Sequence, residues 1–443
     1  MVSQHFKEIW MVKGLVLPTS YSTRRKQRMQ SVRRRFGVLV GGMALSTVAL
    51  LPVPVGAQAQ AGGWISTWTA SQQPPRGVMP ASFSNQTVRQ VVRVSLGGTK
   101  VRIRLSNEFG TKPVLIGAAS VGVAGDKPES PSGSQRPITF SGSKSTILLP
   151  GAPALSDPVD LDVAPLSDVA VNMYLPAATE LNTVHQVGLQ SAFVSRAGDF
   201  TAGSEFPVVD RFANRFFLAG VMVESATPAR AIVTFGDSIT DGTNSTVNTN
   251  SRWPDILARR LKEAGTPLAV LNQGISGNRV LSDGAGVSGL ARFERDVLSQ
   301  PGVSHVVILL GINDIGWPGT AIEPSGIYRT AEEMIAGYKQ MIERAHLRGI
   351  KVIGSPLTPF ENAFAGMPNQ GYFSAEKEAK RQAVNNWIRT SGAFDGIIDF
   401  EPVLADPGRP ASMLGAYDSG DRLHPNDAGY KAMGESIDLK IFQ

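Results

Sequence analysis

The first half of the chain alternates apolar and polar residues over short stretches. From about residue 62 to 229 these stretches are broken by Gly, Pro, Ser and Asp, and no helical period separates them. In "VVRVSLGGTKVRIRL", residues 91–105, the alternation runs up to Gly97-Gly98 and resumes after it, which predicts a β-hairpin turning at a glycine pair that can supply positive φ. The region as a whole predicts an antiparallel β-sandwich.

The second half has unbroken apolar runs separated by helical stretches. Such runs are typical of strands covered on both faces, and the helices between them make right-handed crossovers. One helix is expected around residues 332–348, where apolar residues recur every three or four positions. We therefore predict a doubly wound α/β parallel sheet with strands at residues 231–235, 268–272, 305–310, 350–355 and 396–400.

The positive charge of the chain is concentrated at its N-terminus. The formal net charge is +6, but the first 60 residues hold nine Lys or Arg against one acid, Glu8, so the remainder carries about −2. The folded part is therefore not expected to bind nucleic acid. The chain contains no cysteine, so burial and not disulfides must stabilise an exported protein.

Residues 37–61, "GVLVGGMALSTVALLPVPVGAQAQA", follow this basic segment. Their apolar core of about 15 residues and the small residues after it have the layout of a secretory signal peptide, and are too short and too rich in glycine for a membrane span. "RRRF" at residues 33–36 also resembles a twin-arginine export signal. We predict a leader at residues 1–61, a β-rich accessory domain at 62–229, a catalytic domain at 230–443 and a secreted or periplasmic protein. The alternative for the leader is an uncleaved amphipathic anchor.

Polar residues follow the ends of the predicted parallel strands, where ligands bind in open α/β sheets. Ser238 follows the first strand, Gly277 the second and Asn313 the third, while Asp421 and His424 follow the last. Glycine and asparagine N–H groups are suitable oxyanion donors, and an acid three residues before a histidine can orient it towards a serine. Each feature has an ordinary interpretation as a helix cap, a turn or a structural histidine. Their occurrence together at four strand ends is what predicts a site.

These segments read "GDSITDG", "GISGNR", "GIND" and "DRLHPND" in chain order. With them the second half of the chain resembles the GDSL or SGNH esterase/lipase family, which implies a flavodoxin-like fold. The resemblance implies Ser238 as nucleophile, Gly277 and Asn313 as oxyanion donors beside the Ser238 amide, His424 as general base and Asp421 as its orienting acid. A looser similarity is to exported bacterial members with an N-terminal β-domain. It rests on "RWPDILARRL" (252–261), "RFERDVLSQPGV" (292–303) and residues 92–110.

The function predicted is that of an exported serine hydrolase cleaving carboxylic esters through an acyl-enzyme, without cofactor or metal. Short-chain or acetyl esters are favoured, including acetylated polysaccharide, because no long apolar lid is evident. The partner expected is this ester substrate, an acetylated glycan or a lipid. No nucleic acid and no stable membrane span after cleavage are expected.

Three other functions stay open. A lipase or phospholipase would act on longer acyl chains. The aromatic residues of the loops after the third and fourth strands suit the wall of an acyl pocket or of a glycan groove equally; they are Trp317, Phe360, Phe364, Tyr372 and Phe373. A noncatalytic carbohydrate- or surface-binding protein would use Trp64 and Trp68 of the β-rich domain. A metal hydrolase would need Asp237, Asp241 and Asp314 to cluster, but no HExxH or similar spacing occurs. The four remaining histidines, His5, His185, His305 and His346, are expected to be structural or exposed.

Overall fold

The computed structural model describes residues 63–77, 82–125, 127, 133–203 and 205–443. These residues belong to one compact unit. The predicted leader at residues 1–61 lies outside the described residues, so the prediction of a signal peptide stays a prediction.

The first half of the chain forms a β-rich region of antiparallel strands. One main sheet has the order β1 (Trp64–Thr69), β17 (Leu218–Glu224), β4 (Gly98–Ser106) and β10 (Val159–Val163), with β9 (Pro153–Leu155) also pairing with β4. The other has the order β15 (Val208–Phe212), β14 (Ala192–Ala197), β3 (Gln86–Arg93), β11 (Asp168–Leu175), β6 (Ala118–Val123) and β7 (Arg136–Ile138). Short pairs join β12 (Thr179–Glu180) to β2 (Ser82–Phe83), β13 (Val184–His185) to β16 (Arg215–Phe216), and β5 (Val114–Ile116) to β8 (Thr146–Leu148).

The two main sheets face each other across one apolar core, to which Val88 and Val92 contribute from β3, and Val101 and Ile103 from β4. The predicted antiparallel sandwich is therefore confirmed. The predicted hairpin at residues 91–105 is wrong, because β3 pairs with β11 and β14 whereas β4 pairs with β17, β10 and β9. The chain crosses from one sheet to the other at the glycine pair.

Gly97 and Gly98 serve close backbone approach and not a positive-φ turn. A Cβ at Gly97 would lie 2.3 Å from the carbonyl oxygen of Val163, and one at Gly98 would lie 2.5 Å from that of Glu224. Neither distance is compatible with a side chain, so glycine is needed at both positions for the two sheets to connect here.

The second half forms the predicted parallel sheet, in the order β19 (Leu268–Gly274), β18 (Arg230–Gly236), β20 (Val303–Leu309), β21 (Lys351–Gly354) and β22 (Gly396–Ile397). Numbered within this sheet, the order is 2-1-3-4-5, the flavodoxin-like arrangement. The helices between and after the strands are α1 (Ser238–Asp241), α2 (Trp253–Glu263), α3 (Gly289–Phe293), α4 (Ile312–Gly316), α5 (Ala331–His346), α6 (Ala375–Thr390), α7 (Glu401–Leu404) and α8 (Asp427–Ser436). A π-helical turn (Glu294–Leu298), a hairpin of β23 (Ala405–Asp406) with β24 (Arg409–Met413), and a 3₁₀ turn (Leu439–Phe442) complete the region.

The helices cover the sheet with apolar stripes. Helix α5 starts at a capping box in which Thr330 accepts from the N–H of Glu333, and it buries Met334, Tyr338, Met341 and neighbouring residues, close to the predicted stripe. Given the strand order, right-handed crossovers place α2 and α8 on one face of the parallel sheet and α3, α5 and α6 on the other. The contacts agree, since α2 packs against α8, and α5 packs against α3 and α6. The doubly wound α/β fold is thereby confirmed.

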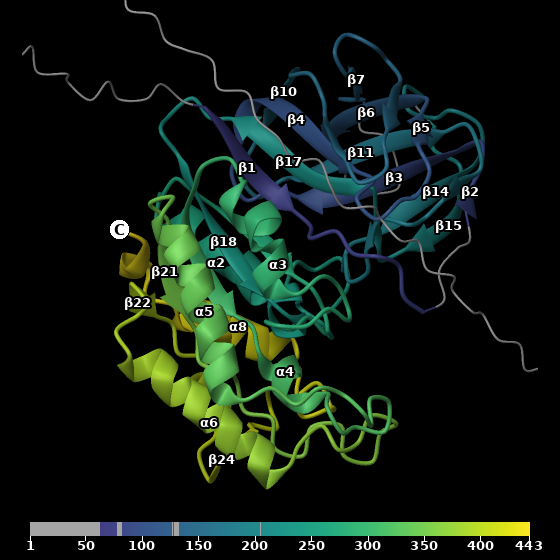
Figure 1. Cartoon of the computed structure of the whole chain (residues 1–443). Coiled ribbons are helices and arrows are strands. Elements are labelled where there is room, and N and C mark those ends of the chain that lie inside the picture. Colours follow the sequence, from purple (N-terminus) through teal and green to yellow (C-terminus); the bar gives the residue numbers. More distant parts are fainter. Residues whose placement is uncertain (1–62, 78–81, 126, 128–132, 204) are drawn as a thin grey trace, which may run out of the picture. The chain divides into compact units, whose positions relative to one another are not determined.

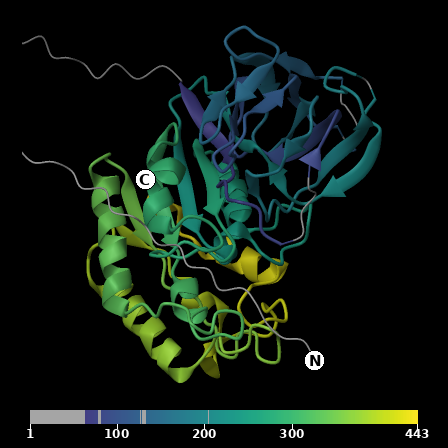
Figure 2. The ribbon, with the colours of Figure 1, turned by 45° about the vertical axis from the view of Figure 1, so that its right-hand side comes forward.

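Strand β1 lies where the β-rich region meets the α/β region, against β19 (Figures 1 and 2). Hydrogen bonds made by buried side chains join the two regions near this contact. The N–H of Val270 donates to Ser95 Oγ over 3.0 Å, and Ser66 Oγ donates to Gln300 Oε1 over 3.3 Å. The β-rich region therefore packs beside β19, the edge strand of the parallel sheet.

Candidate active site

Strand β18 delivers Ser238 to the carboxyl edge of the sheet. The strand ends at Gly236, where a Cβ would lie 2.4 Å from the carbonyl oxygen of Leu309 in the neighbouring strand, so only glycine fits. Asp237 then caps α1 by accepting from the N–H of Ile239 over 3.1 Å. Ser238 is the first residue of that helix, where a backbone N–H has no acceptor within the helix.

Ser238, His424 and Asp421 form a continuous hydrogen-bonded chain. Ser238 Oγ lies 2.8 Å from His424 Nε2, and His424 Nδ1 lies 2.6 Å from Asp421 Oδ2. Because a carboxylate accepts, Nδ1 carries the proton of the neutral ring and Nε2 faces the serine with its lone pair. This is the tautomer that a general base needs to remove a proton from a serine hydroxyl.

The Asp421 carboxylate is held in its ionised form. Burial raises its pKa, but the hydrogen bond and charge of His424 and the N–H groups of Leu423 and His424 outweigh burial and lower the pKa to about 2. Asn244 adds a further donor, at 3.0 Å from Oδ2. The loop that carries Asp421 and His424 ends at Asn426, which caps α8 by accepting from the N–H of Gly429 over 3.0 Å.

Gly277 and Asn313 lie on the wall of the same cavity as Ser238 and His424. Gly277 has φ +82°, and a Cβ there would lie 2.9 Å from that of Ala285. The Asn313 amide is fixed from both sides, since Nδ2 donates to the carbonyl oxygen of Asn278 over 3.0 Å and Oδ1 accepts from the Tyr372 hydroxyl over 2.8 Å. With one Nδ2 hydrogen so engaged, the other remains for a ligand.

The structure thus brings together all five residues that the sequence singled out. Ser238, Gly277 and Asn313 follow β18, β19 and β20, whereas Asp421 and His424 lie on the loop between β24 and α8, beyond the last parallel strand. Residues 234–432 match the model of the GDSL-like Lipase/Acylhydrolase family. The second half of the chain is a GDSL-like lipase/acylhydrolase domain. The protein is accordingly a carboxylic ester hydrolase of the GDSL type.

Solved structures similar to this chain include other GDSL proteins and esterases. A GDSL-like lipase from Bacteroides thetaiotaomicron is 22% identical, with 48% of this chain and 88% of that chain covered and a TM-score of 0.36. Est24, a carbohydrate acetylesterase from Sinorhizobium meliloti, is 19% identical, with 48% and 98% covered and a TM-score of 0.36. The aryl esterase of M. smegmatis is 19% identical, with 47% and 96% covered and a TM-score of 0.35. A comparison with curated proteins finds no match.

A cavity of about 340 Å³ opens over Ser238 of the GDSL domain. Trp317 and Phe364 line it, whereas Phe360 and Tyr372, also expected in the pocket wall, are buried behind it. Charged side chains line the cavity as well. They are the ion pair of Arg279 with Glu323, and Arg76, which comes from the β-rich region.

The three aspartates of the metal-hydrolase alternative have separate partners. Burial raises the pKa of Asp237 to about 7 and that of Asp314 to about 6. Asp314 accepts from the N–H groups of Val280 and Leu281, and Asp241 is bound by His185 and Ser276. Within the ranges that the structure describes, no group of three acidic or histidine side chains is placed to hold a metal ion.

The sequence did not reveal what the β-rich region adds to the site. His185, expected only to be structural or exposed, is buried and bound to Asp241 of the GDSL domain, and Arg76 reaches the cavity. The one signal in the sequence for such a contact was Asp241 in "GDSITDG", an acid close to the end of an apolar strand. The structure buries Asp241, and a buried carboxyl group requires a hydrogen-bond partner. His305 is buried in β20, which lowers its pKa to about 4, and His346 is exposed and paired with Asp395, while His5 lies outside the described residues.

The tryptophans of the binding-protein alternative are half-buried in β1. The guanidinium of Arg102 lies 4.8 Å from the ring centroid of Trp64, and Trp68 packs against the sandwich core. In the part of the chain that the structure covers, no helix combines the length and the apolar character of a membrane span.

Proposed function

We propose that the protein is an exported serine esterase that cleaves short-chain carboxylic esters, acetyl esters of polysaccharide among them, through an acyl-enzyme on Ser238. The observation that carries the proposal is the hydrogen-bonded chain from Ser238 Oγ through His424 to Asp421, with distances of 2.8 and 2.6 Å. Export is proposed from the basic and apolar leader alone.

In the first step Ser238 Oγ attacks the carbonyl carbon of the ester while His424 Nε2 takes the hydroxyl proton. The negative oxygen of the tetrahedral intermediate is stabilised by the N–H groups of Ser238 and Gly277 and by Asn313 Nδ2. Asp421 stabilises the imidazolium through the Nδ1 proton. The intermediate collapses, and the alcohol leaves with the proton of Nε2.

In the second step water attacks the acyl-enzyme carbonyl and gives its proton to Nε2. The same donors stabilise the second tetrahedral intermediate. Its collapse breaks the bond to Ser238 Oγ, which regains the proton from Nε2, and releases the carboxylic acid. The enzyme returns to its starting state with no cofactor consumed.

The cavity favours small acyl groups and polar alcohols. Its volume of about 340 Å³ is near the lower end for ligand sites. The charged side chains of Arg76, Arg279 and Glu323 in its lining would lose hydration against a long alkyl chain. They suit the hydroxyl groups of a sugar better.

The test is the rate of hydrolysis of p-nitrophenyl esters from acetate to palmitate by the purified protein, with Ser238→Ala measured beside it. We expect the highest kcat/KM for acetate or butyrate, and loss of activity in Ser238→Ala by about 10⁴-fold or more. A maximum at about eight carbons or longer would favour the lipase alternative. Activity that survives in Ser238→Ala, or no activity on any ester, would contradict the proposal.

A further inference from the structure

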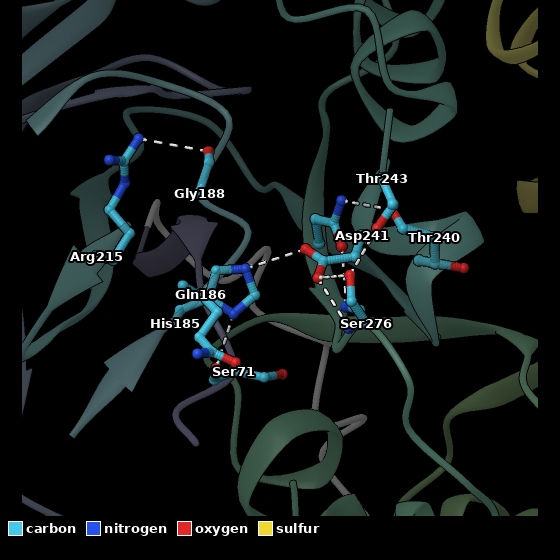
Figure 3. A network of polar contacts seen from close by, with 12 residues as sticks. Ser71, His185, Gln186, Gly188, Arg215, Thr240, Asp241, Thr243 and Ser276 are labelled. Carbon is cyan, nitrogen blue, oxygen red and sulfur yellow. Dashed lines mark hydrogen bonds and ion pairs between the residues drawn. The ribbon is translucent and has the colours of Figure 1, made fainter. Parts of the chain in front are cut away.

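His185 connects the β-rich region to the GDSL domain at the catalytic edge (Figure 3). It lies on β13, and its Nδ1 is 2.9 Å from the backbone carbonyl oxygen of Ser71, also in the β-rich region. Its Nε2 is 3.0 Å from Asp241 Oδ1, at the end of the helix that begins with Ser238. The side chains of His185 and Asp241 are 6% and 1% exposed, so water does not compete for this contact.

The geometry of this contact shows which nitrogen of His185 donates to which acceptor. A backbone carbonyl only accepts, so Nδ1 donates to Ser71, and Nε2 then faces a carboxylate oxygen. The pair must therefore share a second proton, either as imidazolium with carboxylate or as neutral imidazole with carboxylic acid. In both cases removal of one partner leaves the other buried without its hydrogen bond, which is more costly than loss of an exposed contact.

Asp241 connects His185 to the segment after β19 that carries Ser276 and Gly277, which we call the oxyanion loop. Its second oxygen, Oδ2, accepts from the backbone N–H of Ser276 over 2.9 Å and from Ser276 Oγ over 2.8 Å. Ser276 Oγ also lies 2.7 Å from Thr243 Oγ1, and Figure 3 shows Asp241 between His185 and Ser276. The residue after Ser276 is Gly277, whose N–H is the proposed oxyanion donor.

Other contacts of the β-rich region reach the same loop. Arg292, fully buried, donates to Ser71 Oγ over 3.0 Å, to the carbonyl oxygen of Gly236 over 2.9 Å and to Asn278 Oδ1 over 2.9 Å. Gln73 Nε2 donates to the carbonyl oxygen of Ala285, the residue against which Gly277 packs, over 2.7 Å. The loop is therefore held between its own domain and the β-rich region.

We propose that the β-rich region is a structural part of the active site, in which the buried His185–Asp241 pair holds Ser276 and Gly277 in their oxyanion-binding position. The inference rests on the proposed function, because it takes Gly277 as an oxyanion donor. His185 and Asp241 are positioning residues, since both act on the reaction through Ser276 and neither contacts the reacting atoms.

The experiment compares His185→Ala and Asp241→Ala with the wild type in the full-length protein, on p-nitrophenyl acetate. Competent sites are counted by end-point titration with a p-nitrophenyl phosphonate, so that kcat refers to folded sites only. We expect kcat per titrated site to fall by about 10- to 100-fold with little change in KM, because a misplaced donor affects the transition state more than the bound ester. The Ki of an alkylboronic acid, whose tetrahedral adduct occupies the oxyanion position, should rise in parallel.

Ser95→Ala is the matched control. Ser95 is buried, and its hydroxyl also crosses between the two regions, where it accepts from the N–H of Val270 over 3.0 Å. The same hydroxyl donates to the carbonyl oxygen of Thr67 over 2.7 Å, so both of its partners lie outside the oxyanion loop. We expect Ser95→Ala to lower the melting temperature and to leave kcat per titrated site within about twofold of the wild type. An equal loss of kcat in Ser95→Ala and His185→Ala would contradict a specific positioning role.

Asp241→Asn tests whether the hydrogen bonds of residue 241 to Ser276 and His185 are what position the oxyanion loop. The amide oxygen still accepts from Ser276, and the amide nitrogen donates to Nε2 of a neutral His185, so every group keeps a partner. We expect this variant to retain more than about a third of the wild-type kcat, whereas Asp241→Ala does not. Equal losses in the two variants would overturn the proposal.

If His185→Ala does not fold, His185→Gln replaces it in the experiment. The glutamine amide can still donate to one of the two acceptors of His185, the carbonyl oxygen of Ser71 or Asp241 Oδ1. A fall in the kcat per site of His185→Gln with KM unchanged supports the proposal, and a wild-type kcat overturns it. If the wild type is active, Ser238→Ala is inactive and the His185 variants retain full kcat, only this inference fails. If the wild type hydrolyses no ester, the proposed function fails and this inference fails with it.

Discussion

The two regions of this protein contribute to the site in different ways. In the α/β region, Ser238, Gly277 and Asn313 each follow closely after a parallel strand, so a short segment of sequence, such as residues 236–238, places one functional group. The β-rich region contributes through side chains that lie far apart in sequence, such as Ser71 and His185, and that act only once the sandwich has folded. Motifs therefore reveal the chemistry of the first region, and only the structure reveals the supporting contacts of the second.

The energetic roles of the regions should differ accordingly. Substitutions at strand ends of the GDSL domain should abolish or strongly reduce kcat without much loss of stability. Substitutions in the β-rich region should reduce stability and shift loop positions, with smaller effects on rate. The following predictions test this difference, from the largest expected effect to the smallest.

The largest effect is expected for His424→Ala. Loss of the base leaves Ser238 without a proton acceptor, and kcat for p-nitrophenyl acetate should fall by about 10⁴-fold or more. His346→Ala is the control, since this histidine is exposed and pairs with Asp395, and it should stay within about twofold of the wild type. If His424→Ala kept a tenth of the wild-type rate, His424 would not be the general base, and the main contribution proposed for the α/β region would be wrong.

The next effect is expected for Asn313→Ala. Loss of one oxyanion donor should lower kcat by about 10²- to 10³-fold with KM nearly unchanged. Tyr372→Phe is the paired variant. It leaves the Asn313 amide in place and removes only the Tyr372 hydroxyl, which fixes the orientation of that amide. It should cost about tenfold or less. Steady-state kinetics measure both, and a loss below about fivefold in Asn313→Ala would refute its role as donor.

A smaller effect, on stability, is expected for Gln73→Ala in the β-rich region. This buried side chain donates to the carbonyl oxygen of Ala285, which would lose its partner. The free energy of unfolding should fall by about 1–3 kcal/mol, measured by urea denaturation, while kcat falls less than in Asn313→Ala. A loss of kcat as large as that of Asn313→Ala would mean that the two regions do not differ as described.

The smallest effect concerns the acid stability given by Asp421. Its pKa is lowered to about 2 in the folded protein, so its ionised form stabilises the fold above the ordinary pKa of about 3.8, and this contribution is lost as pH falls towards about 2. Asp421→Asn lacks this contribution at every pH. Urea denaturation at about pH 5 and about pH 2.5 should therefore show a difference between wild type and variant that shrinks in acid. A difference that stays constant or grows in acid would be inconsistent with the lowered pKa.

The parallel sheet and the meeting of Ser238 with Asn313 at one cavity were predictable because strand, turn and functional group are adjacent in the sequence. Runs such as residues 231–235 are long and unbroken, and Ser238 or Asn313 follows directly. For the β-rich region, the fold class, an antiparallel sandwich, could be predicted, but which strands pair with one another could not. Alternation at residues 91–105 shows which face of each strand is buried, not which strand lies beside it, so a crossing between two sheets appeared as a hairpin.

The support of the site by the β-rich region was not predictable for a related reason. His185 lies on a two-residue strand that has no periodic pattern, and Asp241 is 56 positions away. Asp241 was visible in "GDSITDG", but the sequence alone offered other aspartates as its neighbours and not a histidine from another region. Contacts of this kind depend on how two cores pack together.

The central claim is that Ser238 is the nucleophile activated by His424. The most direct test is intact-mass measurement and peptide mapping after reaction with a p-nitrophenyl phosphonate, which phosphonylates an activated serine. We expect a single adduct on Ser238, complete loss of ester hydrolysis when it has formed, no adduct in Ser238→Ala and very slow labelling of His424→Ala. An adduct on another residue, or hydrolysis that continues after Ser238 is fully labelled, would contradict it.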